Sequence, residues 1–163
     1  MTLRMRIAVL GALALLLASG LIASPMMSTP AHAAYGPCNT TSLRDVPNLA
    51  GDNVYKFPAR SDNGLSCYMG YQQGSTSAVR ALQEAIIVCY GGTWAAQRVG
   101  NSGGADGIYG TATVEAVRWL QINKLGLSGS ADGVYGPLTR SRMLWPYNYH
   151  GAVLYHCDNP SAY

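Results

Sequence analysis

Charged residues are scarce in this sequence. Asp, Glu, Lys and Arg make up 12% of the 163 residues, and the formal net charge is +3. Two of the basic residues, Arg4 and Arg6, lie near the N-terminus, and without them the net charge falls to +1. A nucleic-acid-binding domain usually carries a strong basic patch. The composition therefore excludes nucleic acid as an expected partner.

Acidic residues that could serve a hydrolase are also few. A glycosidase needs two carboxylates facing each other across a cleft. The Glu residues are Glu84 and Glu115, which we expect on the polar faces of two helices, and Asp106 and Asp132 belong to turns. A serine or cysteine nucleophile would need a nearby base, for which the sequence offers little. We predict that the protein is not an enzyme and has no cofactor.

No two cysteines are closely spaced, which disfavours a zinc site. His156 beside Cys157 is the only adjacent pair of ligand residues. The cysteines are Cys38, Cys67, Cys89 and Cys157, and in an oxidising compartment they predict two disulfides with three possible connectivities. We expect Cys38–Cys67 to close the N-terminal region on itself and Cys89–Cys157 to tie a helix end to the C-terminal tail. No metal is expected.

The first 33 residues have the pattern of a secretory signal peptide. Arg4 and Arg6 precede an apolar run without charge over residues 7–23, and Ala31-His32-Ala33 offers small residues around a cleavage site. The run is long enough that an uncleaved membrane anchor is the alternative. We predict cleavage after Ala33, an extracellular or cell-wall-associated protein, and no stable membrane association after cleavage.

Helical periodicity begins only after residue 74. Residues 34–74 are rich in Pro, Asn, Gly, Ser and Tyr, and we expect an irregular extension with a strand-like stretch at residues 53–57 and room for a hairpin. Apolar spacing then predicts one helix from the Ser75 region to Gly91, a second through Val114 and Leu120, and a third from Pro137 to Pro146. Residues 147–163 form a tail without a helix of its own.

Two motifs are each written twice. ADGIYGTAT at residues 105–113 is followed by ADGVYGPLT at 131–139, and AVRALQ at 78–83 is followed by AVRWLQ at 116–121. Asp-Gly favours a turn because Asp can accept a downstream N–H and Gly tolerates a positive φ. Gly110 and Gly136 then stand at helix N-caps, and Pro137 suits the first helical position. Each repeated loop is therefore expected to start a helix.

Taken together, these motifs resemble the peptidoglycan-binding-like domain, type 1, a small three-helix module of secreted wall hydrolases. The resemblance covers residues 75–146. It implies a mainly α fold, with the disulfide-tied extension and tail added to the module, and a secreted protein that binds peptidoglycan through its glycan strand or stem peptide. Such a module normally accompanies a catalytic domain, for which the chain has no room, so a wall hydrolase is a possible partner. The alternatives are an interaction or inhibitor protein on the same fold, or the targeting subunit of a hydrolase.

The repeated loops are the expected ligand site. Packing the two helices would bring both loops, or one loop and a neighbouring helix, to the rim of one shallow groove, where Tyr109 and Tyr135 could offer ring faces to sugar. The alternative is that the loops serve folding alone, and Trp119 could be either a packing or a binding residue. The full expected set is Asp106, Gly107, Tyr109, Thr113, Trp119, Asp132, Gly133, Tyr135 and Thr139.

Overall fold

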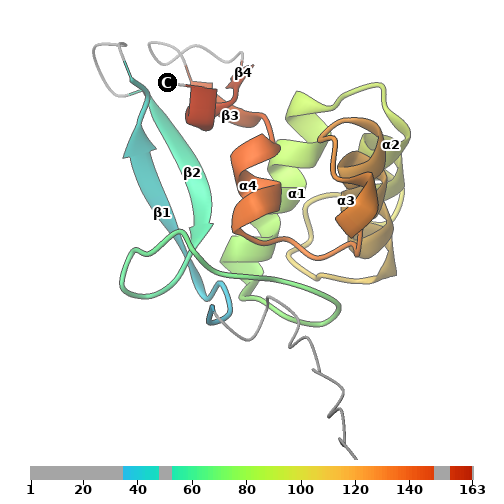
Figure 1. The fold of residues 1–163 in the computed structure, drawn as a ribbon, viewed down its shortest axis with the longest axis horizontal. Helices are drawn as coiled ribbons and strands as arrows, with labels where there is room; N and C mark the ends of the chain where they lie inside the picture. The colour runs from blue at the N-terminus through green and yellow to red at the C-terminus, as the bar shows by residue number, and fades with distance from the viewer. Residues whose placement is uncertain (1–34, 48–52, 149–154, 163) are drawn as a thin grey trace, which may run out of the picture.

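A computed structural model of the protein describes residues 35–47, 53–148 and 155–162, so the predicted signal peptide lies outside the described residues. The sheet stands on one side of the molecule and the helices on the other (Figure 1). The elements in chain order are β1 (Thr40–Asp45), β2 (Val54–Ala59), α1 (Thr76–Cys89), α2 (Trp94–Gly100), α3 (Thr111–Asn123), η2 (Ser128–Ser130), α4 (Pro137–Arg142), β3 (Trp145–Asn148), β4 (Tyr155–Asp158) and η3 (Pro160–Ala162).

The expected mainly α, three-helix fold is wrong. The described residues form four α-helices and a four-stranded antiparallel sheet in the order β1-β2-β3-β4. The region expected to be an irregular extension supplies the β1–β2 hairpin, and the C-terminal tail supplies β4. Tyr55 pairs with Tyr147 to join the hairpin to β3. Residues so far apart in the chain give no local signal of their pairing, so periodicity could not predict this sheet.

The three expected helices are present as α1, α3 and α4. Ser75 caps α1, because its side chain accepts the N–H of Ala78 at 3.2 Å. The helix α4 is shorter than expected: Met143 has extended backbone angles, and Trp145, expected on the helix, begins β3. The seven-residue helix α2, which Thr93 caps, was not expected, because it is too short to display helical periodicity.

One core joins the sheet to the helices. Tyr55 and Phe57 are buried on alternate positions of β2, with Lys56 exposed between them. The Phe57 ring meets the fully buried Trp145 edge-on, with the ring centroids 4.8 Å apart. Large aromatic rings dominate the energetics of such contacts. The strand residues are therefore part of the same core as α1, rather than a separate layer.

Both expected disulfides are present. Cys38 is bonded to Cys67, and Cys89 is bonded to Cys157. The first bond fastens the start of the hairpin to the segment before α1. The second fastens the last residue of α1 to β4, so it ties the fourth strand to the helical part of the core.

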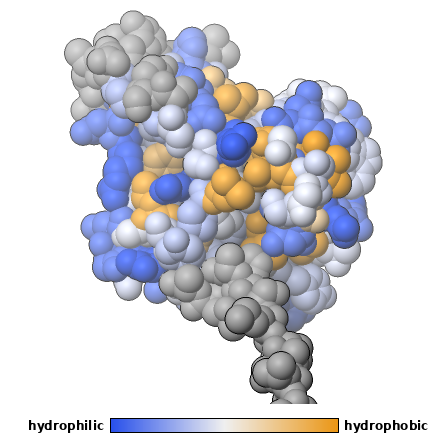
Figure 2. All heavy atoms as spheres, in the orientation of Figure 1, coloured by the Kyte–Doolittle hydropathy of each residue, from blue (hydrophilic) through white to orange (hydrophobic). Residues whose placement is uncertain are grey.

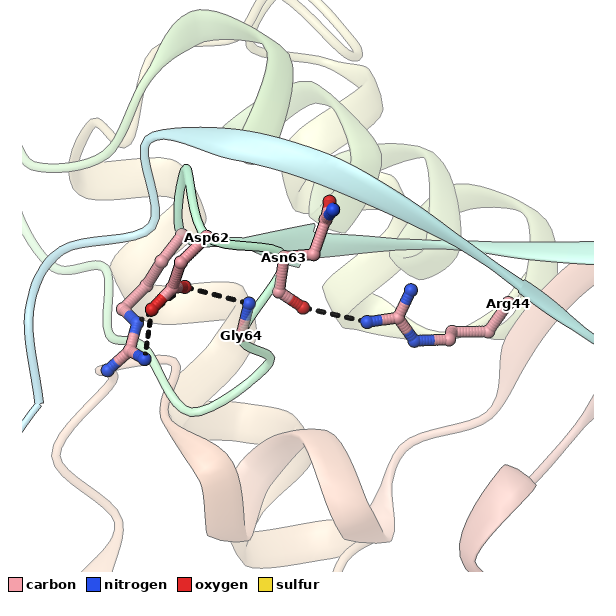
Figure 3. A network of polar contacts seen from close by, with 5 residues as sticks. Arg44, Asp62, Asn63 and Gly64 are labelled. Atoms are coloured by element: carbon pink, nitrogen blue, oxygen red, sulfur yellow. Dashed lines mark hydrogen bonds and ion pairs between the residues drawn. The ribbon is translucent and has the colours of Figure 1, made fainter.

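Polar contacts order the loop that follows β2 (Figure 3). Arg60 forms an ion pair with Asp62 at 2.6 Å, and Asp62 accepts the N–H of Gly64 at 2.9 Å. Arg44 of β1 donates to the Asn63 carbonyl at 2.7 Å. The Arg60 guanidinium holds the pKa of the Asp62 carboxyl below its usual value. Because these side chains are exposed, the contacts position the loop more than they stabilise the fold.

Among the described residues, no helix has the length and apolar character needed to cross a membrane. The apolar run at residues 7–23 lies outside the described residues.

Candidate functional site

The first repeated loop is held by Gln83, a buried residue of α1. The Gln83 Nε2 lies 2.8 Å from the Asp106 carboxylate, and 3.1 Å from both the Ile108 carbonyl and the Thr113 hydroxyl. Its Oε1 accepts the N–H of Gly107 at 2.8 Å. Asp106 also accepts the N–H of Ile108 at 2.8 Å, the turn that the sequence predicts. The side-chain amide of Gln83 therefore holds the first loop through both its Nε2 and its Oε1.

The second repeated loop is held in the same way by Gln121, a buried residue of α3. The Gln121 Nε2 lies 3.1 Å from the Asp132 carboxylate, 3.0 Å from the Val134 carbonyl and 3.1 Å from the Thr139 hydroxyl. Its Oε1 accepts the N–H of Gly133 at 2.9 Å. The two glutamines end the repeated hexapeptides AVRALQ and AVRWLQ. The two glutamines were not among the expected site residues, although their repetition at the end of each hexapeptide marked them as equivalent positions.

Gly107 and Gly133 are required by the close approach of a neighbouring helix. Their φ angles are +81° and +76°. A Cβ on Gly107 would lie 2.8 Å from the Thr76 carbonyl oxygen, and one on Gly133 would lie 2.6 Å from that of Val114. Both glycines therefore allow a loop to pack on the backbone of the helix that clamps it.

Tyr109 and Tyr135 belong to the core. Their side chains are 1% and 0% exposed, and burial raises the pKa of both phenols. The Tyr109 hydroxyl donates to the Gly133 carbonyl at 2.8 Å, and the Tyr135 backbone exchanges two hydrogen bonds with Met69. The expectation that these rings present faces to a sugar is not met in this conformation. A ring without an exposed face cannot stack on a ligand.

The second repeat borders a pocket of about 290 Å³, the second-repeat pocket. It lies at the start of α4, and Leu138, which is 52% exposed, stands in its lining. Hydrophobic residues gather over the region of α4 in Figure 2. The repeat contributes Gln121, Asp132, Val134, Gly136, Pro137, Leu138 and Thr139, and other segments add Tyr35, Tyr68, Leu127 and Ser130.

The first repeat borders an equivalent pocket of about 280 Å³, the first-repeat pocket. Seven lining residues occupy the positions that match those of the second repeat, but the remaining two are polar. The matching residues are Gln83, Asp106, Ile108, Gly110, Thr111, Ala112 and Thr113, and the additions are Arg98 and Ser102. The duplicated motifs therefore line two pockets with equivalent positions. The additional residues of the first-repeat pocket are polar, whereas those of the second-repeat pocket are mostly aromatic or apolar.

The expected binding residues are divided between these two pockets. Asp106 and Thr113 line the first, and Asp132 and Thr139 line the second. The two loops therefore do not share one groove among the described residues, and each borders a pocket of its own. The carboxyl of Asp106 already accepts hydrogen bonds, chiefly from the N–H of Ile108, and these hold its pKa below the usual value. A ligand-binding role for these residues stays a prediction.

Three aromatic residues near the surface were missed. Tyr35 and Tyr68 line the second-repeat pocket, and Trp94 begins α2 with 46% of its surface exposed. Trp94 lies beside Trp119 of α3, which belongs to the expected binding set and is half-buried. The sequence signalled the two tyrosines only through the Tyr-rich region around them. The Trp94 side chain could not be placed without α2.

The described residues contain no cluster of three or more His, Cys, Asp or Glu side chains that could hold a metal ion. Glu115 forms an ion pair with Arg98 at 2.6 Å. Cys157, the cysteine beside His156, is in a disulfide. The polar groups of the pockets are chiefly amide, hydroxyl, carboxylate and guanidinium groups, which are suited to hydrogen bonding with a ligand.

Comparison with known proteins gives a family for the helical part. No curated protein and no solved structure matches the chain. The family model described as "Putative peptidoglycan binding domain" matches residues 75–143, which hold both repeated loops, both clamping glutamines and all four helices. This match confirms the resemblance expected from the repeated motifs: residues 75–143 are similar to that family.

Proposed function

We propose that the protein is secreted and binds bacterial cell-wall peptidoglycan without catalysing a reaction, and that the second-repeat pocket is its principal site. The observation that carries the proposal is the family match over residues 75–143, which includes most of the lining of this pocket. Secretion rests on the signal-peptide pattern of residues 1–33. The two disulfides support it, because such bonds persist in oxidising compartments.

The lining of the second-repeat pocket suits a sugar polymer. Tyr35, Tyr68 and Leu138 provide apolar surface, and the Asp132 carboxylate stands at the same pocket. A sugar ring has C–H groups on its faces and hydroxyls at its edge, so apolar walls with a few polar groups match it. The exposed Tyr35 and Leu138 side chains are the residues that a ligand would contact first.

The non-catalytic part of the proposal rests on how the acidic groups are used. Asp106 and Asp132 are hydrogen-bonded within their own turns, and Glu115 is paired with Arg98. A general acid or base needs a carboxyl group directed at the substrate. One oxygen of each of these three carboxyl groups is instead engaged in holding loops and helices.

Co-sedimentation with purified sacculi tests the proposal. The mature protein is expected to sediment with sacculi. The double variant Tyr35→Ala, Leu138→Ala should bind about tenfold more weakly, which corresponds to roughly 1.4 kcal/mol. Leu43→Ala is the matched control, because Leu43 is an exposed apolar residue of β1 outside the pocket.

A protein that stays in the supernatant would contradict the proposal, and capture of one secreted protein instead would favour the interaction or inhibitor alternative. Clearing of the sacculus suspension by the protein alone would contradict the non-catalytic part.

A further inference from the structure

We propose a second ligand site on the α2–α3 face, made by Trp94, Trp119 and the first-repeat pocket, which binds an amino-sugar ring together with its peptide substituent. The inference rests on the proposed function, because it names a part of the same polymer. It adds a site that is distinct from the second-repeat pocket.

Trp94 and Trp119 form an aromatic surface between α2 and α3. Their ring centroids lie 6.4 Å apart and their planes are inclined by 33°. Trp94 is 46% exposed, whereas Trp119 is half-buried and packs against the core. The buried ring therefore supports the exposed one. An exposed tryptophan held in place by a second ring loses little side-chain entropy when a sugar stacks on it.

The same two helices carry a polar pair one turn away. Arg98 follows Trp94 by four residues on α2, and Glu115 precedes Trp119 by four residues on α3. Residues four apart lie on one face of a helix, about 5 to 6 Å apart. The Arg98 Nε donates a hydrogen bond to the Glu115 carboxylate at 2.6 Å. The Trp94–Trp119 contact and the Arg98–Glu115 ion pair therefore join α2 to α3 one helical turn apart.

Arg98 also lines the first-repeat pocket, so this pocket adjoins the contacts between α2 and α3. Its Nε is bonded to Glu115, but its two Nη nitrogens have no hydrogen-bond partner among the described residues. The Thr111 hydroxyl in the same lining also has no partner there, and Thr111 is exposed. The pocket thus offers several open hydrogen-bond donors beside the tryptophan surface.

The charges near this pocket select the occupant. Arg98 is balanced by Glu115, and the exposed Asp106 carboxylate lies in the lining. A simple anion gains little from such a mixed set. A peptide suits it better, because amide C=O and N–H groups can meet both the Arg98 donors and the Asp106 acceptor. The aromatic surface would hold the sugar ring, and the adjoining pocket would hold the first peptide groups attached to it.

The test uses the mature protein, purified sacculi and soluble disaccharide-peptide fragments released from the sacculi. In the Tyr35→Ala, Leu138→Ala background, which weakens the second-repeat pocket, Trp94→Ala should raise the Kd for the fragments about tenfold. Tyr155→Ala is the control, because it removes an exposed aromatic ring from β4. Arg98→Gln should weaken the binding of peptide-bearing fragments about threefold, and weaken the binding of glycan without peptide by less.

Fluorescence gives an independent readout that needs no variant. Saturating fragments should shift the tryptophan emission of the parent, since Trp94 is exposed and Trp145 is fully buried. A parent that binds fragments without an emission shift, or a Trp94→Ala substitution that leaves the Kd of that background unchanged, overturns the second site. These outcomes leave the proposed function standing if the parent sediments with sacculi. A parent that fails to sediment overturns both proposals.

Discussion

The hydroxyl of Tyr109 donates a hydrogen bond to the carbonyl of Gly133 at 2.8 Å, so the first repeated loop is fastened directly to the second. Both groups are buried. The tyrosine of the other loop does not reciprocate: the Tyr135 hydroxyl is buried and has no hydrogen-bond partner among the described residues. The two copies of the motif therefore have the same fold but different hydrogen bonding.

This asymmetry predicts opposite results for one substitution made at two positions. Tyr109→Phe should lower the free energy of unfolding by about 1 to 3 kcal/mol, because it leaves the Gly133 carbonyl buried without its donor. Tyr135→Phe should be neutral or stabilising, because it removes a buried hydroxyl that has no partner. Urea unfolding monitored by circular dichroism measures both. Equal losses in the two variants would contradict the assigned hydrogen bond.

The clamping glutamines should be among the most sensitive polar residues of the fold. Gln83→Leu is expected to lower the free energy of unfolding by about 2 kcal/mol or more, because the Gly107 N–H and other loop groups lose their partner. Gln121→Leu should give a similar loss for the same reason. Gln97→Leu on α2 is the matched control, since Gln97 is exposed. Thermal unfolding in which all three variants match the parent would disprove the clamp.

Replacing the glycine of either turn should lower the stability of the protein. Gly107→Ala and Gly133→Ala should each destabilise the protein by more than about 1 kcal/mol, because a positive φ is combined with contact against a helix backbone. Gly129→Ala should have a small effect, since no atom outside its immediate chain neighbours lies within 4 Å of the added Cβ. The midpoint of chemical denaturation, compared across the three variants, checks this ordering.

The disulfides should contribute unequally. Cys89–Cys157 joins residues 68 apart in sequence, whereas Cys38–Cys67 joins residues 29 apart. Each is expected to add about 2 to 4 kcal/mol, and the loop-closure model makes the longer loop worth about 0.8 kcal/mol more. Paired Cys→Ala variants of each bond, unfolded in urea, measure the difference. A larger loss from the shorter loop would show that native contacts outweigh chain entropy.

Local chemistry made the helical repeats predictable. Asp106-Gly107 and Asp132-Gly133 indicate turns by their residue types alone, and Ser75 and Pro137 mark helix starts. The cysteine pairing was also expected, because each bond anchors a segment that lacks a helix. Cys38–Cys67 closes the N-terminal region on itself, and Cys89–Cys157 ties the C-terminal tail to a helix end. In contrast, the repetition of the two glutamines did not indicate what they contact, since their partners lie 11 to 30 residues away in the sequence.

The sheet and the surface were decided by tertiary structure. Nothing local to Trp145 or Tyr147 indicates that this segment leaves a helix and pairs with the hairpin and with residues 155–158, because β-pairing depends on distant partners. The tyrosines of the two motifs illustrate the same limit. Their position after Asp-Gly determined that they lie in loops, but only the packing of those loops on α1, α3 and each other decided that the rings are buried.

The sequence by itself determined the two turns, the helices they start and the family resemblance of residues 75–143, because each depends on residue types at short or fixed spacing. Tertiary structure alone decided the four-stranded sheet, the glutamine clamps, the burial of Tyr109 and Tyr135, and the division of one expected groove into two pockets. Each of these depends on which distant segments fill the space beside a loop, and packing sets that after local structure has formed.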